Sequence, residues 1–197
     1  MSGDGAAGCE SGGAQWAIRT VAVIGAGRVG RNFALACAAA GLDVVLEDVM
    51  PANLRRAQEE YADLTAQNAG ARGRLAVATT IEDAVREADI AVDFVPDELE
   101  SKLEIFCMVD RMAPPKTILL TPSEAQSITD LASCTYRGER CFAVRGGLGF
   151  VGPMRLLHPA GATSEAIEAM SGFLRALGYE VWVEVDTDAS NLVKNLG

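Results

Sequence analysis

Three glycines near the start of the chain have the spacing of a phosphate-binding loop. They form the motif G-x-G-x-x-G at Gly25, Gly27 and Gly30, directly after the apolar run Thr20–Ile24. In this motif the first glycine permits a tight turn, and the second lets a pyrophosphate approach the backbone. The third lets the following helix lie against the first strand. The motif therefore predicts a dinucleotide site.

The residues that follow complete the predicted cofactor site. A helix is expected to start at Arg28, so that free N–H groups in its first turn, at Arg28 and Val29, face the anion. Asp48 follows Gly30 by 18 residues. It ends the second predicted strand, where an acid accepts hydrogen bonds from the adenine ribose. A carboxylate there repels a 2′-phosphate, which favours NAD over NADP. The structural alternative is a glycine-rich turn that serves helix packing, with Asp48 as a solvated acid.

Short apolar runs alternate with helix-like stretches along the rest of the chain. The predicted strands are 20–24, 44–46, 75–78, 90–95, 117–120, 141–144 and 180–185, and the predicted helices are 28–40, 51–69, 81–87, 98–112, 127–133 and 165–177. Helices between such strands imply right-handed crossovers. The expected fold class is α/β, a Rossmann-type doubly wound, mainly parallel sheet with helices on both faces. Residues 1–15 are rich in Gly and Ala and are expected to be a disordered tail before a single domain over 16–185.

Charge and composition exclude several classes of partner. Lys plus Arg number 17 and Asp plus Glu 27, giving a net charge of −10. This balance disfavours broad electrostatic binding to nucleic acid or to an anionic membrane. No run approaches the ~18 apolar residues of a membrane span. The five cysteines are widely spaced without C-x-x-C, and the start of the chain lacks a secretory signal. We therefore expect a cytoplasmic protein with reduced thiols and no metal site.

Several segments agree in order and spacing with one known family. They are IGAGRVGRNFALACAAAGLDVVLEDV, ADIAVDFVPDELESKLEIFCMVDRMAPPKTIL, SITDLA, PMRLLHPAGATSEAIEAMSGFLRALGYEVWVEVDT and NLVKNL. Through these segments, residues 18–196 resemble the N-terminal, NAD-binding domain of the 3-hydroxyacyl-CoA dehydrogenase family. The resemblance implies NAD as cofactor. It also implies that residues 186–197 begin a linker or helix toward the family's helical C-terminal domain, which is absent from the chain.

The resemblance implies further cofactor contacts. Val95 and Pro96 would lie against the adenosine and ribose, Asp97 and Lys102 beside the nicotinamide ribose, and Ser123 on the loop that approaches the nicotinamide. For Asp97 and Lys102 the structural alternative is ordinary chemistry at the start and on the surface of a helix.

The segment that carries the family's chemistry departs from its pattern. The family uses a His held by a Glu, in His-Phe-Phe-Asn-Pro followed by Met-Lys-Leu-Val-Glu, assisted by a Ser. Here residues 142–158 read FAVRGGLGFVGPMRLLH. The His position falls on Arg145 or on Gly146, depending on the direction of alignment. The Glu position falls on His158, and the family's Ser falls on Glu124. One hypothesis is a swapped catalytic pair, in which Glu124 orients His158 or is itself the base. The structural alternatives are a strand-end histidine and an acid in the first turn of a helix.

These residues support three functional hypotheses. The first is an NAD-dependent oxidoreductase of the 3-hydroxyacyl-CoA dehydrogenase type, which interconverts a 3-hydroxyacyl and a 3-oxoacyl thioester on CoA or a carrier protein. The rival is a catalytically degenerate NAD-binding module with a regulatory or assembly role. The third is a different hydroxy acid as substrate, with its carboxylate bound by Arg145. Apolar residues near the end of the chain, at Leu192, Val193 and Leu196, predict self-association into a homo-oligomer.

Overall fold

The computed structural model describes residues 18–67, 73–148 and 153–187. The elements along the chain are β1 (Thr20–Ile24), α1 (Arg28–Ala39), β2 (Asp43–Glu47), α2 (Pro51–Gln67), β3 (Arg74–Ala78), α3 (Ile81–Val85), β4 (Ile90–Asp93), α4 (Leu99–Met112), β5 (Ile118–Pro122), α5 (Ile128–Ala132), the 3₁₀ turn η1 (Gly138–Arg140), β6 (Cys141–Arg145), β7 (Pro153–His158), α6 (Ser164–Ala176) and β8 (Glu180–Val185). Each predicted strand and helix is present, with small shifts at its ends.

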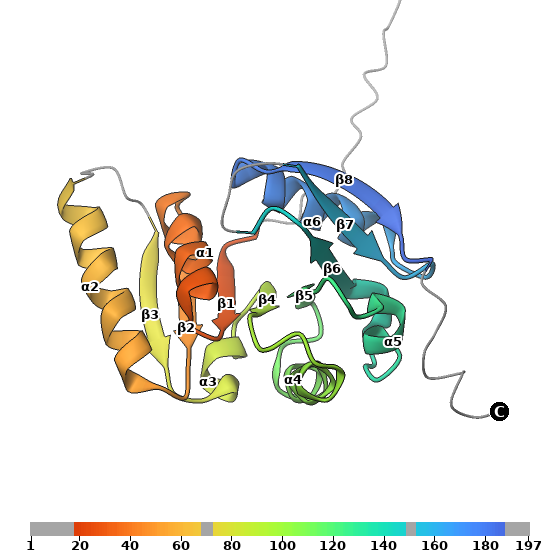
Figure 1. Ribbon diagram of the computed structural model, residues 1–197, viewed down its shortest axis with the longest axis horizontal. Helices are drawn as coiled ribbons and strands as arrows, with labels where there is room; N and C mark the ends of the chain where they lie inside the picture. Colours follow the sequence, from red (N-terminus) through yellow and green to blue (C-terminus); the bar gives the residue numbers. More distant parts are fainter. Residues whose placement is uncertain (1–17, 68–72, 149–152, 188–197) are drawn as a thin grey trace, which may run out of the picture.

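The strands form one sheet in the order β3-β2-β1-β4-β5-β6-β7-β8 (Figure 1). Neighbouring strands are parallel except β6 and β7. The chain leaves β1 toward β2 and β3, then returns to the other side of β1 at β4. This reversal defines a doubly wound sheet, so the predicted fold class is confirmed.

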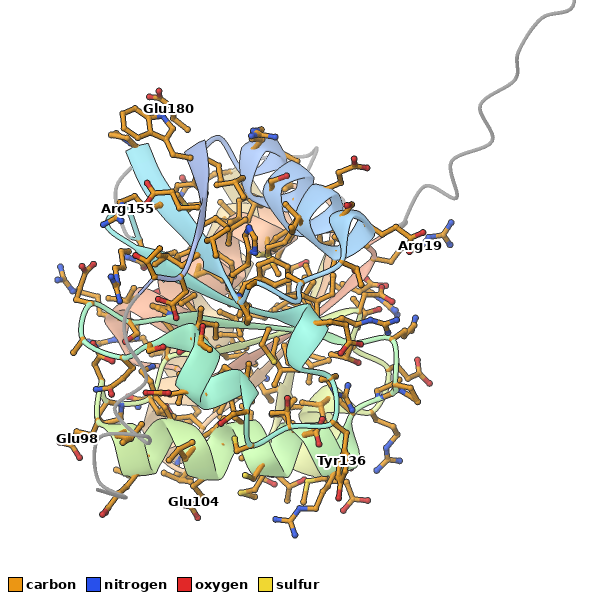
Figure 2. The ribbon with its side chains drawn as sticks, turned by 90° about the vertical axis from the view of Figure 1, so that its right-hand side faces the viewer. Arg19, Glu98, Glu104, Tyr136, Arg155 and Glu180 are labelled. Carbon is orange, nitrogen blue, oxygen red and sulfur yellow. The ribbon has the colours of Figure 1, made fainter. Side chains whose placement is uncertain are left out.

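Helices cover both faces of the sheet. Successive strand residues point to opposite faces, so each face has its own apolar core. Val21 and Val23 face a core shared with α1, α2 and α6. Ala22 and Ile24 face a second core shared with α3, α4 and α5. Strands that are buried on both faces have apolar residues at successive positions, and this is why their sequences read as continuous apolar runs. Charged side chains such as Glu98, Glu104 and Glu180 project from the surface (Figure 2).

Strand β7 was not among the predicted strands. It has six residues, and a glycine-rich stretch of sequence separates it from β6. It is stabilised by antiparallel pairing with β6, in which Ala143 lies opposite Leu157 and Arg145 opposite Arg155. Such long-range pairing leaves little signal in the local sequence, because the preference of a segment for a strand depends on the strands beside it.

Asp186, the first residue after the expected domain at 16–185, contacts the start of α5. Its carboxylate accepts hydrogen bonds from Ser127 Oγ at 2.7 Å and from the Thr129 amide at 2.9 Å. Asp186 therefore joins the end of β8 to the start of α5. The expected tail at 1–15 and the apolar residues Leu192, Val193 and Leu196 lie outside the described residues.

Candidate functional site

The predicted cofactor residues gather at one edge of the sheet. Strands β1, β2, β4, β5 and β6 are parallel neighbours, so the loops that follow them lie along the same edge. In a doubly wound sheet this carboxyl edge is where ligands bind, next to the point at which the strand order reverses. Here the reversal lies between β1 and β4, beside the glycine loop.

Two of the three motif glycines are required by the fold itself. Gly25 has φ +98°, a conformation that favours glycine. A Cβ on Gly30 would lie 2.0 Å from the Gly25 carbonyl oxygen, so α1 can approach the loop only with glycine there. Gly27 differs, because a Cβ at this position would meet no atom within 4 Å. Its φ of −58° is open to any residue. The space over Gly27 is thus free for a ligand.

Within the described residues, no side chain caps the start of α1. Thr80, Ser127 and Thr163 cap α3, α5 and α6 with their side chains. The N-cap of α1 is Gly27, which has no side chain, and the first turn of α1 carries no acid. Uncapped N–H groups at a helix start bind anions. Arg28 and Val29 are exposed in this turn.

Asp48 lies directly beside this loop. Its Oδ2 accepts hydrogen bonds from the Ala26 amide at 2.7 Å and from Asn53 Nδ2 at 3.0 Å, and its Oδ1 accepts one from the Met50 amide at 2.7 Å. The carboxylate is therefore fixed at the end of β2, where a ribose would meet it. Val49 is 83% exposed and Met50 56% exposed. These apolar residues form an open surface next to Asp48 that the sequence analysis did not single out.

Asp97 and Ser123 join two loops of the same edge. Asp97 Oδ1 accepts a hydrogen bond from Ser123 Oγ at 2.5 Å, and Asp97 Oδ2 accepts one from the Glu124 amide at 2.9 Å and one from the Ala125 amide at 3.1 Å. Burial favours a higher pKa for Asp97, but these hydrogen bonds outweigh it and hold the pKa of the carboxyl below its ordinary value. Val95 is half-buried at the same edge.

Pro96 is exposed beside Val95, at the carboxyl end of β4. The chain turns there, and the Glu98 amide donates to the Pro96 carbonyl at 2.8 Å just before α4 begins. Val95 and Pro96, which the resemblance places against the adenosine and ribose, therefore both lie at this edge of the sheet.

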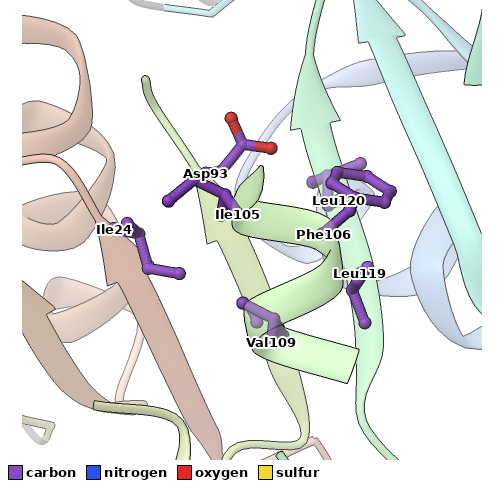
Figure 3. A pocket seen from close by; sticks show the side chains of 8 residues that line it. Ile24, Asp93, Ile105, Phe106, Val109, Leu119 and Leu120 are labelled. Carbon is purple, nitrogen blue, oxygen red and sulfur yellow. The ribbon is translucent and has the colours of Figure 1, made fainter. Parts of the chain in front are cut away.

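Lys102 lies beneath this edge, with its ammonium group buried between the ends of β4 and β5. The side chain is fully buried, and its Nζ donates to Asp93 Oδ1 at 3.0 Å and to Thr121 Oγ1 at 2.8 Å. Burial raises the pKa of Asp93, and the Lys102 charge opposes that shift. Asp93 also lines a cavity of about 10 Å³ next to Phe106 (Figure 3). Because a buried carboxylate requires a partner, Lys102 is held between β4 and β5 rather than presented to a ligand.

A hollow of about 390 Å³ opens where β5 and β6 end. The residues that line it are Asp97, Pro122, Ser123, Glu124, Val144, Gly146, Gly147 and Leu148. Gly146 and Gly147 have φ of +74° and +73°, and the Gly146 amide donates to Glu124 Oε1 at 2.7 Å. Two exposed acids, Asp97 and Glu124, therefore line this hollow next to the cofactor loops.

Comparison with protein families identifies this arrangement. Residues 20–158 match the model of the 3-hydroxyacyl-CoA dehydrogenase, NAD-binding domain. The chain belongs to the 3-hydroxyacyl-CoA dehydrogenase family. The matched part is its NAD-binding domain, and the open space over Gly27, the uncapped start of α1 and Asp48 fit that cofactor.

Curated relatives agree with this assignment. A 3-hydroxybutyryl-CoA dehydrogenase from Bradyrhizobium diazoefficiens is 30% identical over 189 residues, which cover 87% of this chain and 63% of that protein. A probable 3-hydroxybutyryl-CoA dehydrogenase from Bacillus subtilis is 29% identical over 71% of this chain and 51% of its own length. The chain therefore spans about half to two thirds of these relatives.

Solved structures show the same fold. A 3-hydroxyacyl-CoA dehydrogenase from Archaeoglobus fulgidus superposes with a TM-score of 0.72 at 27% identity, covering 90% of this chain and 60% of that one. An (S)-3-hydroxybutyryl-CoA dehydrogenase from Ralstonia eutropha gives a TM-score of 0.76 at 22% identity, covering 91% of this chain and 68% of that one.

The catalytic positions of the family are changed in this chain. The structure places Gly146 in the hollow and leaves Arg145 out of its lining. Arg145 Nη2 instead donates to the Gln126 carbonyl at 3.3 Å. This geometry does not support the prediction that Arg145 binds a substrate carboxylate there.

The structure does not bring Glu124 and His158 together. Leu157 lies opposite Ala143, so His158 is level with Phe142, near the amino end of β6. Glu124 contacts Gly146, four residues further along, which is about 13 Å at the rise of a strand. The His158 ring packs near Phe142 with centroids 6.5 Å apart, and Nδ1 lies 2.9 Å from the Pro159 carbonyl oxygen. Antiparallel β7 carries this histidine away from the hollow.

Within residues 18–67, 73–148 and 153–187, no helix is long and apolar enough to cross a membrane. In the same part of the chain, no three His, Cys, Asp or Glu side chains are grouped so that they could hold a metal ion.

Proposed function

We propose that this chain supplies the cofactor site of an NAD-dependent dehydrogenase that oxidises the 3-hydroxyl of an acyl thioester, carried on CoA or a carrier protein. One observation carries the proposal: a glycine whose Cβ would meet only open space stands at an uncapped helix start, and the hollow with Glu124 lies along the same edge. The relatives named as 3-hydroxybutyryl-CoA dehydrogenases support the substrate class.

Each group of residues at this edge would bind a different part of the cofactor. The amides of Arg28, Val29 and Gly30 at the start of α1 would bind the pyrophosphate, and Asp48 would accept hydrogen bonds from the ribose. Bound NAD supplies the acceptor for the hydride that leaves the carbinol carbon. Asp97 and Ser123 hold the loop that carries Glu124.

Glu124 is the proposed general base. One of its oxygens, Oε1, is hydrogen-bonded by the Gly146 amide, and among the described residues no donor meets Oε2. Oε2 would accept the hydroxyl proton while the C–H bond breaks and the C=O bond forms. A positioned carboxylate can act in this way when it lies within hydrogen-bond reach of the hydroxyl.

A second candidate function is an NAD-binding module without catalysis. It is favoured by the position of His158, which is the single histidine of the chain and lies away from the hollow. The family's His base therefore has no equivalent in this chain. Such a module would bind NAD and turn over no hydroxyacyl substrate.

Turnover measurements distinguish the two functions. The full chain is mixed with NAD and either 3-hydroxybutyryl-CoA, the matching carrier-protein thioester or free 3-hydroxybutyrate, and NADH is followed by its absorbance. Turnover on a thioester that falls at least about 100-fold in Glu124→Gln supports the dehydrogenase with Glu124 as base. Saturable NAD binding without turnover on any of the three supports the module.

We also propose a cytoplasmic location. Cys37, Cys107, Cys134 and Cys141 are free thiols, as expected in a reducing compartment. Self-association stays a prediction, and analytical ultracentrifugation of the full chain tests it.

A further inference from the structure

The peptide groups of Ala26, inside the glycine loop, are hydrogen-bonded on both sides. The Ala26 N–H donates to Asp48 Oδ2 at 2.7 Å, and the Ala26 carbonyl accepts from Arg31 Nη1 at 3.2 Å. Ala26 is fully buried, so both groups are turned into the protein. The two peptide groups that flank Ala26 are therefore each held from within, one by its N–H and one by its carbonyl, immediately before the position where a pyrophosphate would meet the backbone.

Arg31 is itself held by the neighbouring helix. It lies on α1, is only 7% exposed, and donates through Nε to Glu60 Oε2 on α2 at 2.7 Å. A guanidinium is a planar fork that can bind a carboxylate with one nitrogen and a carbonyl with another. Here the fork joins Glu60 to the loop, and its positive charge lies directly behind the proposed anion site.

The same helix holds Asp48. Asn53, in the first turns of α2, donates from Nδ2 to Asp48 Oδ2 at 3.0 Å. Asp48 Oδ2 also accepts the Ala26 amide. Helix α2 thus reaches the loop by two routes, through Glu60 and Arg31 to the Ala26 carbonyl, and through Asn53 and Asp48 to the Ala26 amide.

We propose that Arg31, Glu60 and Asn53 are positioning residues for the adenosine diphosphate half of the cofactor. None of the three needs to touch NAD. They act through the Ala26 peptide and the Asp48 carboxylate, which they hold in the orientation that pyrophosphate and ribose require. Groups behind a ligand shell commonly change affinity by 10- to 100-fold in metal sites, and the same logic applies to a preorganised loop. This inference rests on NAD binding by the domain.

A plain clamp between α1 and α2 is the alternative. A clamp would stabilise the fold and leave ligand affinity in the folded protein unchanged. Positioning predicts instead that affinity for one half of the cofactor changes while affinity for the other half does not. The affinities of the folded variant for the two halves of the cofactor therefore distinguish the two roles, because a change in stability alone does not alter them.

The test uses isothermal titration calorimetry of the full chain with NAD, ADP-ribose and nicotinamide mononucleotide. In Arg31→Met we expect NAD and ADP-ribose to bind about tenfold more weakly and nicotinamide mononucleotide to bind as in the wild type. Arg31→Lys should recover part of the affinity. The matched control is Arg74→Met, which removes an exposed arginine paired with Asp43 at the opposite edge, and should leave all three affinities unchanged.

A second variant keeps the test valid if Arg31→Met does not fold. Asn53→Ala removes one donor to Asp48 from a partly exposed side chain and should weaken ADP-ribose severalfold. Wild-type affinity for ADP-ribose in folded Arg31→Met or in Asn53→Ala would overturn the positioning role. A wild-type chain that binds neither NAD nor ADP-ribose would instead overturn the cofactor site itself, together with this inference.

Discussion

Ser123 donates a 2.5 Å hydrogen bond from its Oγ to Asp97 Oδ1, and this contact joins the loop after β4 to the loop after β5. The amides of Glu124 and Ala125 meet the other carboxylate oxygen of Asp97. One acid therefore orders the backbone of the residue that we propose as base. The role that the resemblance gives to Asp97, beside the nicotinamide ribose, is compatible with this only if the ligand shares an oxygen already in use.

The stability of this edge should depend on pH through Asp97. Its lowered pKa means that the ionised form stabilises the folded state. That contribution is fully present above the ordinary value near ~3.9 and is lost as pH falls through the folded pKa. We expect urea unfolding of the wild type to show a steeper loss of stability than Asp97→Asn between about pH 5 and about pH 2. Identical slopes would show that the carboxylate contributes nothing to this contact.

Gly27→Ser should separate cofactor binding from folding. A Cβ at this position meets no protein atom, and serine is a good N-cap for α1. We expect the free energy of unfolding to stay within about 1 kcal/mol of the wild type. The added side chain fills the space proposed for pyrophosphate, so NAD should bind at least about tenfold more weakly, ~1.4 kcal/mol.

Gly30→Ser is the matched comparison for Gly27→Ser. Its Cβ would lie 2.0 Å from the Gly25 carbonyl oxygen, so α1 must move away from the loop. Thermal unfolding should show a loss of more than about 2 kcal/mol for this variant. Equal affinity for NAD in Gly27→Ser and wild type would remove the main support for the cofactor site.

Local patterns predicted most of the fold. The run Thr20–Ile24 is apolar at each position after its first, which is typical of a strand buried on both faces, and β1 has these bounds. The positions of Gly25, Gly30 and Asp48 in the fold could also be predicted, because turn geometry and the end of a strand determine them. These features depend on residues close in sequence.

What sequence reasoning missed depends on pairings between distant residues. The sequence of α4 shows Lys102 at a helical position, but only the neighbouring strand, with Asp93, explains why its ammonium is buried. The position of His158 follows from its register with β6, which no local pattern specifies. Arg31 was not singled out because its partners, Ala26 and Glu60, come together only when α1 packs against α2.

Arg137 should contribute far more to stability than an exposed arginine. Its Nε donates to Asp110 Oδ1 at 2.8 Å, and Nη1 to the Pro114 carbonyl at 2.6 Å, with 9% of the side chain exposed. Arg137→Met leaves the buried Asp110 carboxylate without its cation, so urea unfolding should show a loss of about 3–5 kcal/mol. Arg74→Met breaks a pair that is 82% and 46% exposed and should cost less than about 1 kcal/mol. Similar losses in both variants would contradict the burial of Arg137.

Lys102→Met decides between the structure and the resemblance for this residue. The structure pairs its ammonium with Asp93 inside the protein, so the variant leaves a buried carboxyl without its cation. We expect unfolding to show a loss of about 3–5 kcal/mol. Loss of the cation also raises the pKa of Asp93 further, so the variant should lose stability as pH rises above about 4, since the folded state then holds a proton that the unfolded state releases.

The double variant Lys102→Met with Asp93→Asn gives the control, because it removes both charges. It should be more stable than Lys102→Met alone, with a coupling energy of about 1–3 kcal/mol in a double-mutant cycle. NAD affinity, measured on folded protein at low temperature, should stay within about threefold of the wild type in both variants. This is expected for a buried ammonium that, in the described part of the chain, donates to Asp93 and Thr121. A large loss of NAD affinity with unchanged stability would place Lys102 at the cofactor instead, because a lysine that binds ligand from the surface leaves no buried charge behind when it is removed.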